Sequence, residues 1–397
     1  MSAAPSSPGT PGTAPARPAA PGWIVSPAYD LAWFSGPALL ASLAALLVPD
    51  GAEVGLFGWL VLVVIVDVAH TWATLYRAWL DPAARRDRPA LLWGVPLVVF
   101  AAAMTVHTLA APWFWTVLAY VAVFHFVRQQ QGFAALYRAR AGIARATLEA
   151  RVEHFTVAML CVFPVAWWHA HLPRRYAWFT PTDFLVGLPP AVATALGVVT
   201  ALSFATWLGL RTRTLLQGRR DPRLPGGPRP GGGPPLRSDP RLPSAPHLRT
   251  GAWQPGRDLW VLSTAVSWTV GIVLTDGDAA FTLANVLAHG VPYFALVHHV
   301  GRRQWADGEG AVTPRWFAPA AILAFLALPV AAAFAEELAW DALVWREHFF
   351  APADLPEWLV AVAVPLLATP QLTHYLLDGY LWRLGPPGSG LRRWVLG

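Results

Sequence analysis

Lysine is absent from this chain, so all 29 of its basic residues are arginine. Its absence excludes Schiff bases of retinal or pyridoxal phosphate, and also the lysine of a Walker nucleotide-binding loop. Cysteine occurs once, as Cys161 in an apolar run. A single thiol forms neither a disulfide within the chain nor a thiolate metal cluster.

Charge is also scarce, because only 13% of the 397 residues are charged while 55% are hydrophobic. A soluble protein of this size needs more charge to cover its surface. The apolar residues come in runs of about twenty, long enough to cross a hydrocarbon core roughly 30 Å thick. The sequence therefore predicts an all-α fold, a polytopic transmembrane helix bundle.

Two low-complexity stretches divide the chain. Residues 1–22, rich in Pro, Ala and Ser, lack the parts of a signal peptide and are expected to be a disordered tail. Residues 216–256 are basic and rich in Pro and Gly, which predicts a disordered cytoplasmic loop. Transmembrane helices 1–6 are expected in 23–215 and helices 7–10 in 257–385, followed by a short cytoplasmic tail at 386–397.

The apolar runs predict about ten spans, with eight as the lower bound. The expected segments are 33–49, 55–80, 89–110, 112–138, 147–172, 186–214, 257–275, 279–303, 315–335 and 355–384.

Arginine in the connections indicates the orientation. The connection after the second segment holds Arg85, Arg86 and Arg88, and those after the fourth, sixth and eighth segments are also basic. The intervening connections are acidic or poor in arginine, except for Arg174 and Arg175. The positive-inside rule then places both termini in the cytoplasm. The abundance of Ala, Pro and Gly suggests a GC-rich bacterial genome and hence a bacterial inner membrane. Since topology explains the net charge of +6, no nucleic-acid partner is expected.

This topology brings several histidines to one depth in the cytoplasmic half of the bilayer. Such side chains cost a few kcal/mol each at that depth unless they face a polar interior and find partners. A bound cation would offset this cost, because neutral imidazole is a common metal ligand. Six histidines are the expected metal ligands: His70, His125, His154, His289, His299 and His374.

Polar residues accompany these histidines at spacings of three or four, which places them on the same helix face. Asp67, Tyr293 and Asp378 are expected to take part in catalysis, Tyr293 as a donor of a proton or hydrogen bond. Four more residues are expected to hold the ligands in place through hydrogen bonds: Arg128, Gln129, Asn285 and Gln371. A site dominated by histidine suits iron first, with zinc or copper as alternatives.

Other functions fit the same residues. The histidines, carboxylates and arginines could relay protons in a proton-coupled transporter or a channel-like carrier. They could also serve only as polar contacts between helices in a structural membrane protein. Haem held by two histidines is a weaker alternative, since no helix carries two of these histidines about half a membrane apart.

The histidine-rich pattern resembles the integral-membrane non-haem iron oxygenases. These include the fatty acid desaturase and hydroxylase superfamily and the carotene-cleaving oxygenases of the Brp/Blh type. The desaturase boxes HxxxH and HxxHH are absent, and VHHV at 297–300 has only the adjacent pair. The motifs DVAHTWATLYR, HFVRQQQGF, HGVPYF and THYLLDGYLWR look closer to an uncharacterised family of bacterial multi-pass proteins. The resemblance implies a metal-dependent oxidoreductase acting on a lipid or isoprenoid. Because no flavin or nucleotide motif is found, any reducing equivalents would come from an external electron donor.

Overall fold

The computed structural model describes residues 22–181, 183–184, 186–220, 253–307, 316–318, 321–385 and 390–396. Within these ranges the chain is mainly helical and holds no strand, which confirms the all-α prediction. The tail at 1–22 and the loop at 216–256 lie almost entirely outside the described residues. At the borders of that loop, a helix continues to Arg220 and another begins at Pro255.

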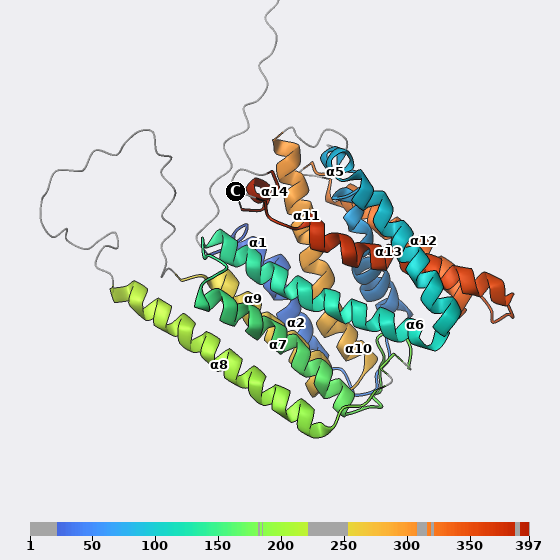
Figure 1. Cartoon of the computed structure of the whole chain (residues 1–397), viewed down its shortest axis with the longest axis horizontal. Coiled ribbons are helices and arrows are strands. Elements are labelled where there is room, and N and C mark those ends of the chain that lie inside the picture. Colours follow the sequence, from blue (N-terminus) through green and yellow to red (C-terminus); the bar gives the residue numbers. More distant parts are fainter. Residues whose placement is uncertain are drawn as a thin grey trace, which may run out of the picture.

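The helices form one bundle, with α8 at its edge against α7 and α11 passing behind α6 and α13 (Figure 1). In chain order the helical segments are α1 (Pro27–Asp30), η1 (Leu31–Ser35), α2 (Gly36–Ala45), α3 (Leu56–Gly58), η2 (Trp59–Val68), α4 (Ala69–Trp72), η3 (Ala73–Tyr76), α5 (Pro82–Asp87), α6 (Pro89–Arg140), α7 (Leu148–Ala170), α8 (Pro190–Arg220), α9 (Pro255–Trp268), η4 (Thr269–Leu274), α10 (Asp278–Phe281), η5 (Thr282–Val286), α11 (Leu287–Ala306), α12 (Ile322–Trp340), η6 (Asp341–Trp345), α13 (Glu357–Leu381) and α14 (Gly390–Leu396).

Seven helical stretches of the described chain are long and apolar enough to cross a membrane. They are Leu56–Tyr76, Pro89–Arg140, Leu148–Ala170, Pro190–Gln217, Asp278–Ala306, Ile322–Trp345 and Glu357–Leu381. The second contains two of the expected segments, because a kink at Ala110 divides the 52 residues of α6, two residues before Pro112. The expected segments 33–49 and 257–275 are helical too, but they are not among the seven. A count of ten spans remains a prediction.

The helix α12 with η6 extends beyond its expected end at 335. It continues through Glu336 and Glu337 to Trp345, a stretch that the sequence pattern assigned to an acidic connection. The Glu336 side chain is buried, and its Oε2 accepts a 2.6 Å hydrogen bond from the indole Nε1 of Trp72. Acidic residues therefore lie inside this helix. The expected segment ended just before them because their charge interrupts the apolar run.

The connections rich in arginine meet at one end of the bundle, which we call the arginine-rich end and define by α5, α14 and the C-terminal end of α11 (Figure 1). Arg393 of α14 lies 3.4 Å from the carboxylate of Asp307, which follows α11. Arg88 donates a hydrogen bond to the carbonyl of Tyr380 at the end of α13. The segment 386–397, expected as a tail, contains α14, whose Trp394 packs into the core.

Two π-helical stretches and one glycine allow close packing at the middle of the bundle. The stretches η2 and η5 directly precede α4 and α11 and pack against each other. A Cβ at Gly290 would lie 2.7 Å from the carbonyl oxygen of Val66 in η2. Only glycine permits this approach of α11 to η2, and it brings His289 of α11 next to His70 of α4. π-Helical turns of this kind are frequent at functional sites.

Candidate metal centre

Four histidines from four different helices meet at one buried point. His70 comes from α4, His125 from α6, His289 from α11 and His374 from α13. One ring nitrogen of each lies within 4.8 Å of those of the other three. All four side chains are buried, with exposed fractions between 0% and 4%. Residues spread over 305 positions of the chain thus converge, as the sequence predicted for these four.

The spacing of the ring nitrogens fits a single metal ion. The Nε2 atoms of His289 and His70 are 3.0 Å apart, and those of His374 and His125 are 3.2 Å apart. Four imidazole nitrogens at about 2.1 Å from an ion in a tetrahedron are about 3.4 Å from one another. The rings of His70 and His289 stand at 87° to each other and those of His125 and His289 at 81°, so the rings radiate from a common centre. The two short distances also fit a hydrogen bond within each pair, but all four nitrogens gather within 4.8 Å, where one ion can bind them together.

Aromatic side chains hold the imidazole rings in place. Phe126 stacks on His289 with ring centroids 3.6 Å apart and planes within 8°. Tyr375 stacks on His125 at 4.5 Å. The ring of Tyr293 meets those of His70 and His374 edge to face. The centre is therefore enclosed by rings, which excludes bulk water and fixes each ligand's orientation.

A chain of hydrogen bonds sets the tautomer of His374. Tyr293 donates its hydroxyl proton to Oδ1 of Asp378 at 2.8 Å. The Tyr293 hydroxyl oxygen then accepts from Thr74 at 2.9 Å, and Thr74 Oγ1 accepts from Nδ1 of His374 at 2.7 Å. An ionised Asp378 carboxylate only accepts, and in that form it would set every direction in this chain. With the carboxylate in that form, His374 would carry its proton on Nδ1, and the lone pair of its Nε2 would face the centre, as metal binding requires.

Other expected residues lie around the centre. Oδ1 of Asp67 is 3.7 Å from Nδ1 of His70, and the Asp67 side chain keeps an exposed fraction of 30%. Gln129 donates its side-chain amide to the backbone carbonyl of His289 at 2.7 Å. Asn285 lies one turn before His289, where the absence of a side chain at Gly271 leaves room for its amide. Gln371 lies three residues before His374 on α13.

Three expected site residues do not reach the four histidines. His154 of α7 contacts Gln131, with its Nε2 at 3.2 Å from the amide nitrogen. His299 is ten residues after His289, about 15 Å along α11, and its ring packs near Tyr29. Arg128 is exposed and donates to Gln131. Neither His154 nor His299 belongs to the group of four, because depth in the membrane alone does not bring side chains to the same point.

Thr74, Phe126 and Tyr375 were not expected at the centre. Thr74 follows His70 by four residues and shares its helix face, a spacing that could have identified it. Phe126 and Tyr375 directly follow His125 and His374 in sequence, which gives no sign that their rings stack on other ligands.

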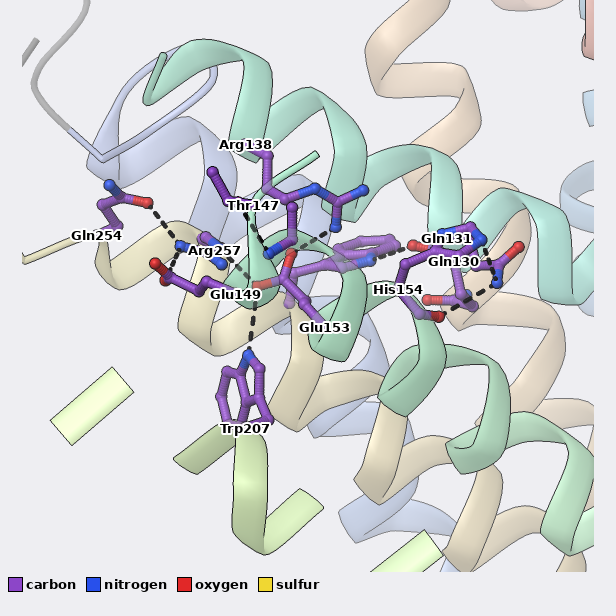
Figure 2. A network of polar contacts seen from close by, with 12 residues as sticks. Gln130, Gln131, Arg138, Thr147, Glu149, Glu153, His154, Trp207, Gln254 and Arg257 are labelled. Atoms are coloured by element: carbon purple, nitrogen blue, oxygen red, sulfur yellow. Dashed lines mark hydrogen bonds and ion pairs between the residues drawn. The ribbon is translucent and has the colours of Figure 1, made fainter. Parts of the chain in front are cut away.

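A second buried polar cluster lies in another part of the bundle and also draws on four helices (Figure 2). Its centre is Glu153 of α7, which is fully buried. Glu153 accepts hydrogen bonds from Arg138 of α6 at 2.6 Å, from Arg257 of α9 at 2.5 Å and from the indole of Trp207 on α8 at 3.2 Å. Arg211 of α8 adds further ion pairs, and its guanidinium binds Asp258 through two nitrogens, at 2.7 and 2.9 Å.

The charges of this ion-pair network balance. Three guanidinium groups, of Arg138, Arg211 and Arg257, face three carboxylates, of Glu149, Glu153 and Asp258. Because cations and anions are both supplied by the chain, the network has no need of an external ion, and its geometry suits a structural role.

No family model, curated protein or solved structure shows significant similarity to this chain.

Proposed function

We propose that this chain is a metal-dependent oxidoreductase of a bacterial inner membrane, with iron held by His70, His125, His289 and His374. The observation that carries this proposal is the convergence of four buried ring nitrogens within 4.8 Å of one another. Imidazole suits iron, zinc and copper. Iron is favoured because a redox-active ion at this centre would supply the chemistry needed to oxygenate an apolar substrate.

The surroundings of the centre support a lipid or isoprenoid as the substrate. The centre lies within spanning helices, so an apolar molecule can reach it from the bilayer without crossing water. Phe126 and Tyr375 offer apolar ring surfaces beside it. The Asp67 side chain, which is 30% exposed and lies next to His70, marks the side from which a substrate would approach. An external electron donor would act from the arginine-rich end, which the positive-inside rule assigns to the cytoplasm.

The chain's own residues have distinct tasks in this proposal. Asp378, Tyr293 and Thr74 fix the tautomer of His374, and Tyr293 can also return a proton to the reacting molecule, since its ring touches two ligands. Gln129 anchors the backbone of His289. Asp67 lies on the other side of His70, with Oδ1 3.7 Å from Nδ1, from where its charge can act on the imidazole ring.

Metal analysis of the purified protein tests this proposal. Protein extracted in detergent without added metal is expected to hold about one iron per chain, in line with one four-histidine centre. A variant with all four histidines changed to alanine is the matched control and should hold none. Loss of oxygen uptake by this variant, in membranes supplied with isoprenoid lipids, would support the oxygenase assignment. A folded wild-type protein without stoichiometric iron, zinc or copper would overturn it.

A proton-coupled transporter is the second candidate, and acidic side chains within the spans favour it. Asp67 lies in the span Leu56–Tyr76, and Glu336 and Glu337 lie in Ile322–Trp345. Oε1 of Glu336 is buried without a hydrogen-bond partner. Proton uptake into proteoliposomes by metal-free protein, abolished in Asp67→Asn, would favour transport over oxidation.

A further inference from the structure

The motif HFVRQQQGF contains three consecutive glutamines, and each has a different partner. Gln129 binds the carbonyl of His289, and Gln130 accepts from Thr264 at 2.8 Å. Gln131 accepts at its Oε1 from Nη1 of Arg128 at 2.9 Å. The amide nitrogen of Gln131 lies 3.2 Å from Nε2 of His154 and 3.3 Å from the His154 carbonyl. The first two glutamines bind the core, whereas the third joins two residues on the surface.

Gln131 orients both of its surface neighbours. Its amide donates to Nε2 of His154, so that nitrogen carries a lone pair and the neutral ring carries its proton on Nδ1. Its carbonyl takes one N–H of Arg128 and leaves the other guanidinium protons available. Both Arg128 and His154 are exposed, while Gln131 is buried beneath them. Figure 2 shows His154 beside Gln131 on the neighbouring helix.

Arg128 lacks an acidic partner. Among the described residues, the ion pairs include none to Arg128, and its hydrogen bond goes to a neutral amide. Arg138 and Glu153 both lie near His154, but they are paired with each other, so their charges offset. Arg128 lies within a spanning helix, where an exposed cation without a partner is costly. This arrangement leaves positive charge and hydrogen-bond donors facing the bilayer. A bound anion would neutralise the charge and accept from these donors.

The depth of the pair fits the headgroup region of the membrane. His154 is six residues after the first residue of α7, about 9 Å along the helix. Arg128 is deeper on α6, but its guanidinium bonds to Gln131, three residues nearer the arginine-rich end. The long side chain therefore extends along the helix toward the headgroup region, as arginine side chains in membrane helices commonly do.

We propose that Arg128 and His154, held in position by Gln131, bind the phosphate headgroup of an anionic membrane lipid. The planar guanidinium can bind two phosphate oxygens, and Nδ1–H of His154 adds a third donor from a second helix. The occupant is a lipid because both side chains face the bilayer. This site is independent of the metal, and its test does not require a metal-loaded protein.

Native mass spectrometry of the full chain tests the proposal. Phosphatidylglycerol is added to chelator-treated protein in detergent, and phosphatidylcholine serves as the neutral lipid. Arg128→Gln and His154→Gln are each expected to weaken the tightest phosphatidylglycerol binding roughly tenfold, the value of one charge-assisted contact. Arg145→Gln is the matched control, because Arg145 is an exposed arginine between α6 and α7, and it should change binding less than about twofold.

Three results would overturn the proposal. Equal losses in Arg128→Gln and Arg145→Gln would show general attraction to a basic surface. Unchanged binding in both Arg128→Gln and His154→Gln would show that the lipid binds elsewhere. Competition by inorganic phosphate at the affinity of the lipid would identify a free anion as the ligand. If Arg128→Gln does not fold, Arg128→Lys, which keeps the charge, is expected to retain binding while His154→Gln loses it.

Discussion

The four-histidine centre and the ion-pair network around Glu153 are alike in burial and in construction. Each takes side chains from four helices, and each places polar groups where water is excluded. They differ in what completes them. The network supplies equal numbers of guanidinium groups and carboxylates, whereas the centre brings together four nitrogens of the same kind. The Thr74 hydroxyl oxygen lies 2.7 Å from Nδ1 of His374, where it can hold the ring's proton so that Nε2 presents a lone pair to the centre.

This difference separates structural from functional polar clusters in a membrane protein. Burial alone does not identify a site, because Glu153 and Arg257 of the network are as buried as the four histidines. A cluster with balanced charges needs no added ion. Its net contribution to the free energy of unfolding is small compared with the loss that follows when one partner is removed. A cluster of four imidazole nitrogens can be completed by a cation that joins it, which is the role that we propose for a metal ion. The following predictions test that contrast, beginning with the largest expected effect.

Changing one ligand should separate the centre from nearby histidines. His289→Ala is expected to lower metal affinity more than about 100-fold, beyond the range for residues that only support ligands. His154→Ala is the matched control, because it removes a histidine from a spanning helix outside the group of four. Equilibrium dialysis followed by elemental analysis measures both. Equal metal retention by the two variants would contradict a four-histidine site.

Breaking the network should affect stability and leave metal binding intact. Glu153→Gln removes the carboxylate that two buried arginines share and is expected to lower the free energy of unfolding by about 3–5 kcal/mol. Unfolding by detergent titration measures this loss. Glu149→Gln is a milder control, since the Glu149 side chain is 20% exposed. A folded Glu153→Gln protein that loses its metal would show that the two clusters are coupled.

Thr74 offers a finer test of the centre. Thr74→Val keeps the shape of the side chain but removes the acceptor for Nδ1 of His374, so metal affinity should fall about 10- to 100-fold. Thr74→Ser keeps the hydroxyl and should bind metal nearly as tightly as the wild type. Competition with a chromogenic chelator gives both affinities. If the valine variant binds as tightly as the wild type, the hydrogen-bond chain does not set the tautomer.

The sequence predicted the helical fold, and four of the six histidines that it named as candidate ligands do meet, because both follow from local chemistry. Long apolar runs favour helices in a membrane, and each histidine there needs a partner. It could not predict which histidines meet, since that depends on how the helices rotate and approach. His299 lies on the same helix as His289 yet is about 15 Å away along its axis. The approach that unites His70 and His289 depends on Gly290 against Val66, a tertiary contact.

The role of a charged residue is likewise not predictable from its position in the sequence. Arg174 departs from the predicted pattern of arginine at one end of the bundle. In the structure it donates to Asp276 at 2.8 Å and to the carbonyl of Thr275 at 2.7 Å, so its role is to join two connections. Glu336 likewise interrupts an apolar run, yet it is buried in the span with Trp72 as its donor. Whether a charged residue marks the end of a span depends on its partner in the fold, which the sequence does not give.

The ion pair of Arg174 and Asp276 gives the smallest expected effect, because it lies in connections and the Asp276 side chain is 35% exposed. Burial works to raise the pKa of Asp276, but hydrogen bonds from Arg174 and from the backbone of Arg175 outweigh it and hold the pKa below its ordinary value. The pair therefore stabilises the fold fully above pH of about 4 and loses this contribution as the pH falls further.

Asp276→Asn should remove this part of the pH dependence and cost less than about 1 kcal/mol at neutral pH. Thermal unfolding of the metal-free wild type and of metal-free Asp276→Asn between acidic and neutral pH measures it, since the other titrating groups, the four histidines included, are common to both proteins. Arg174→Gln should remove only part of the pH dependence, because the backbone N–H of Arg175 still bonds to Asp276. If Asp276→Asn lowered the free energy of unfolding as much as Glu153→Gln does, exposure to solvent would not weaken ion pairs in this protein. The proposed difference between buried and exposed ion pairs would then be wrong.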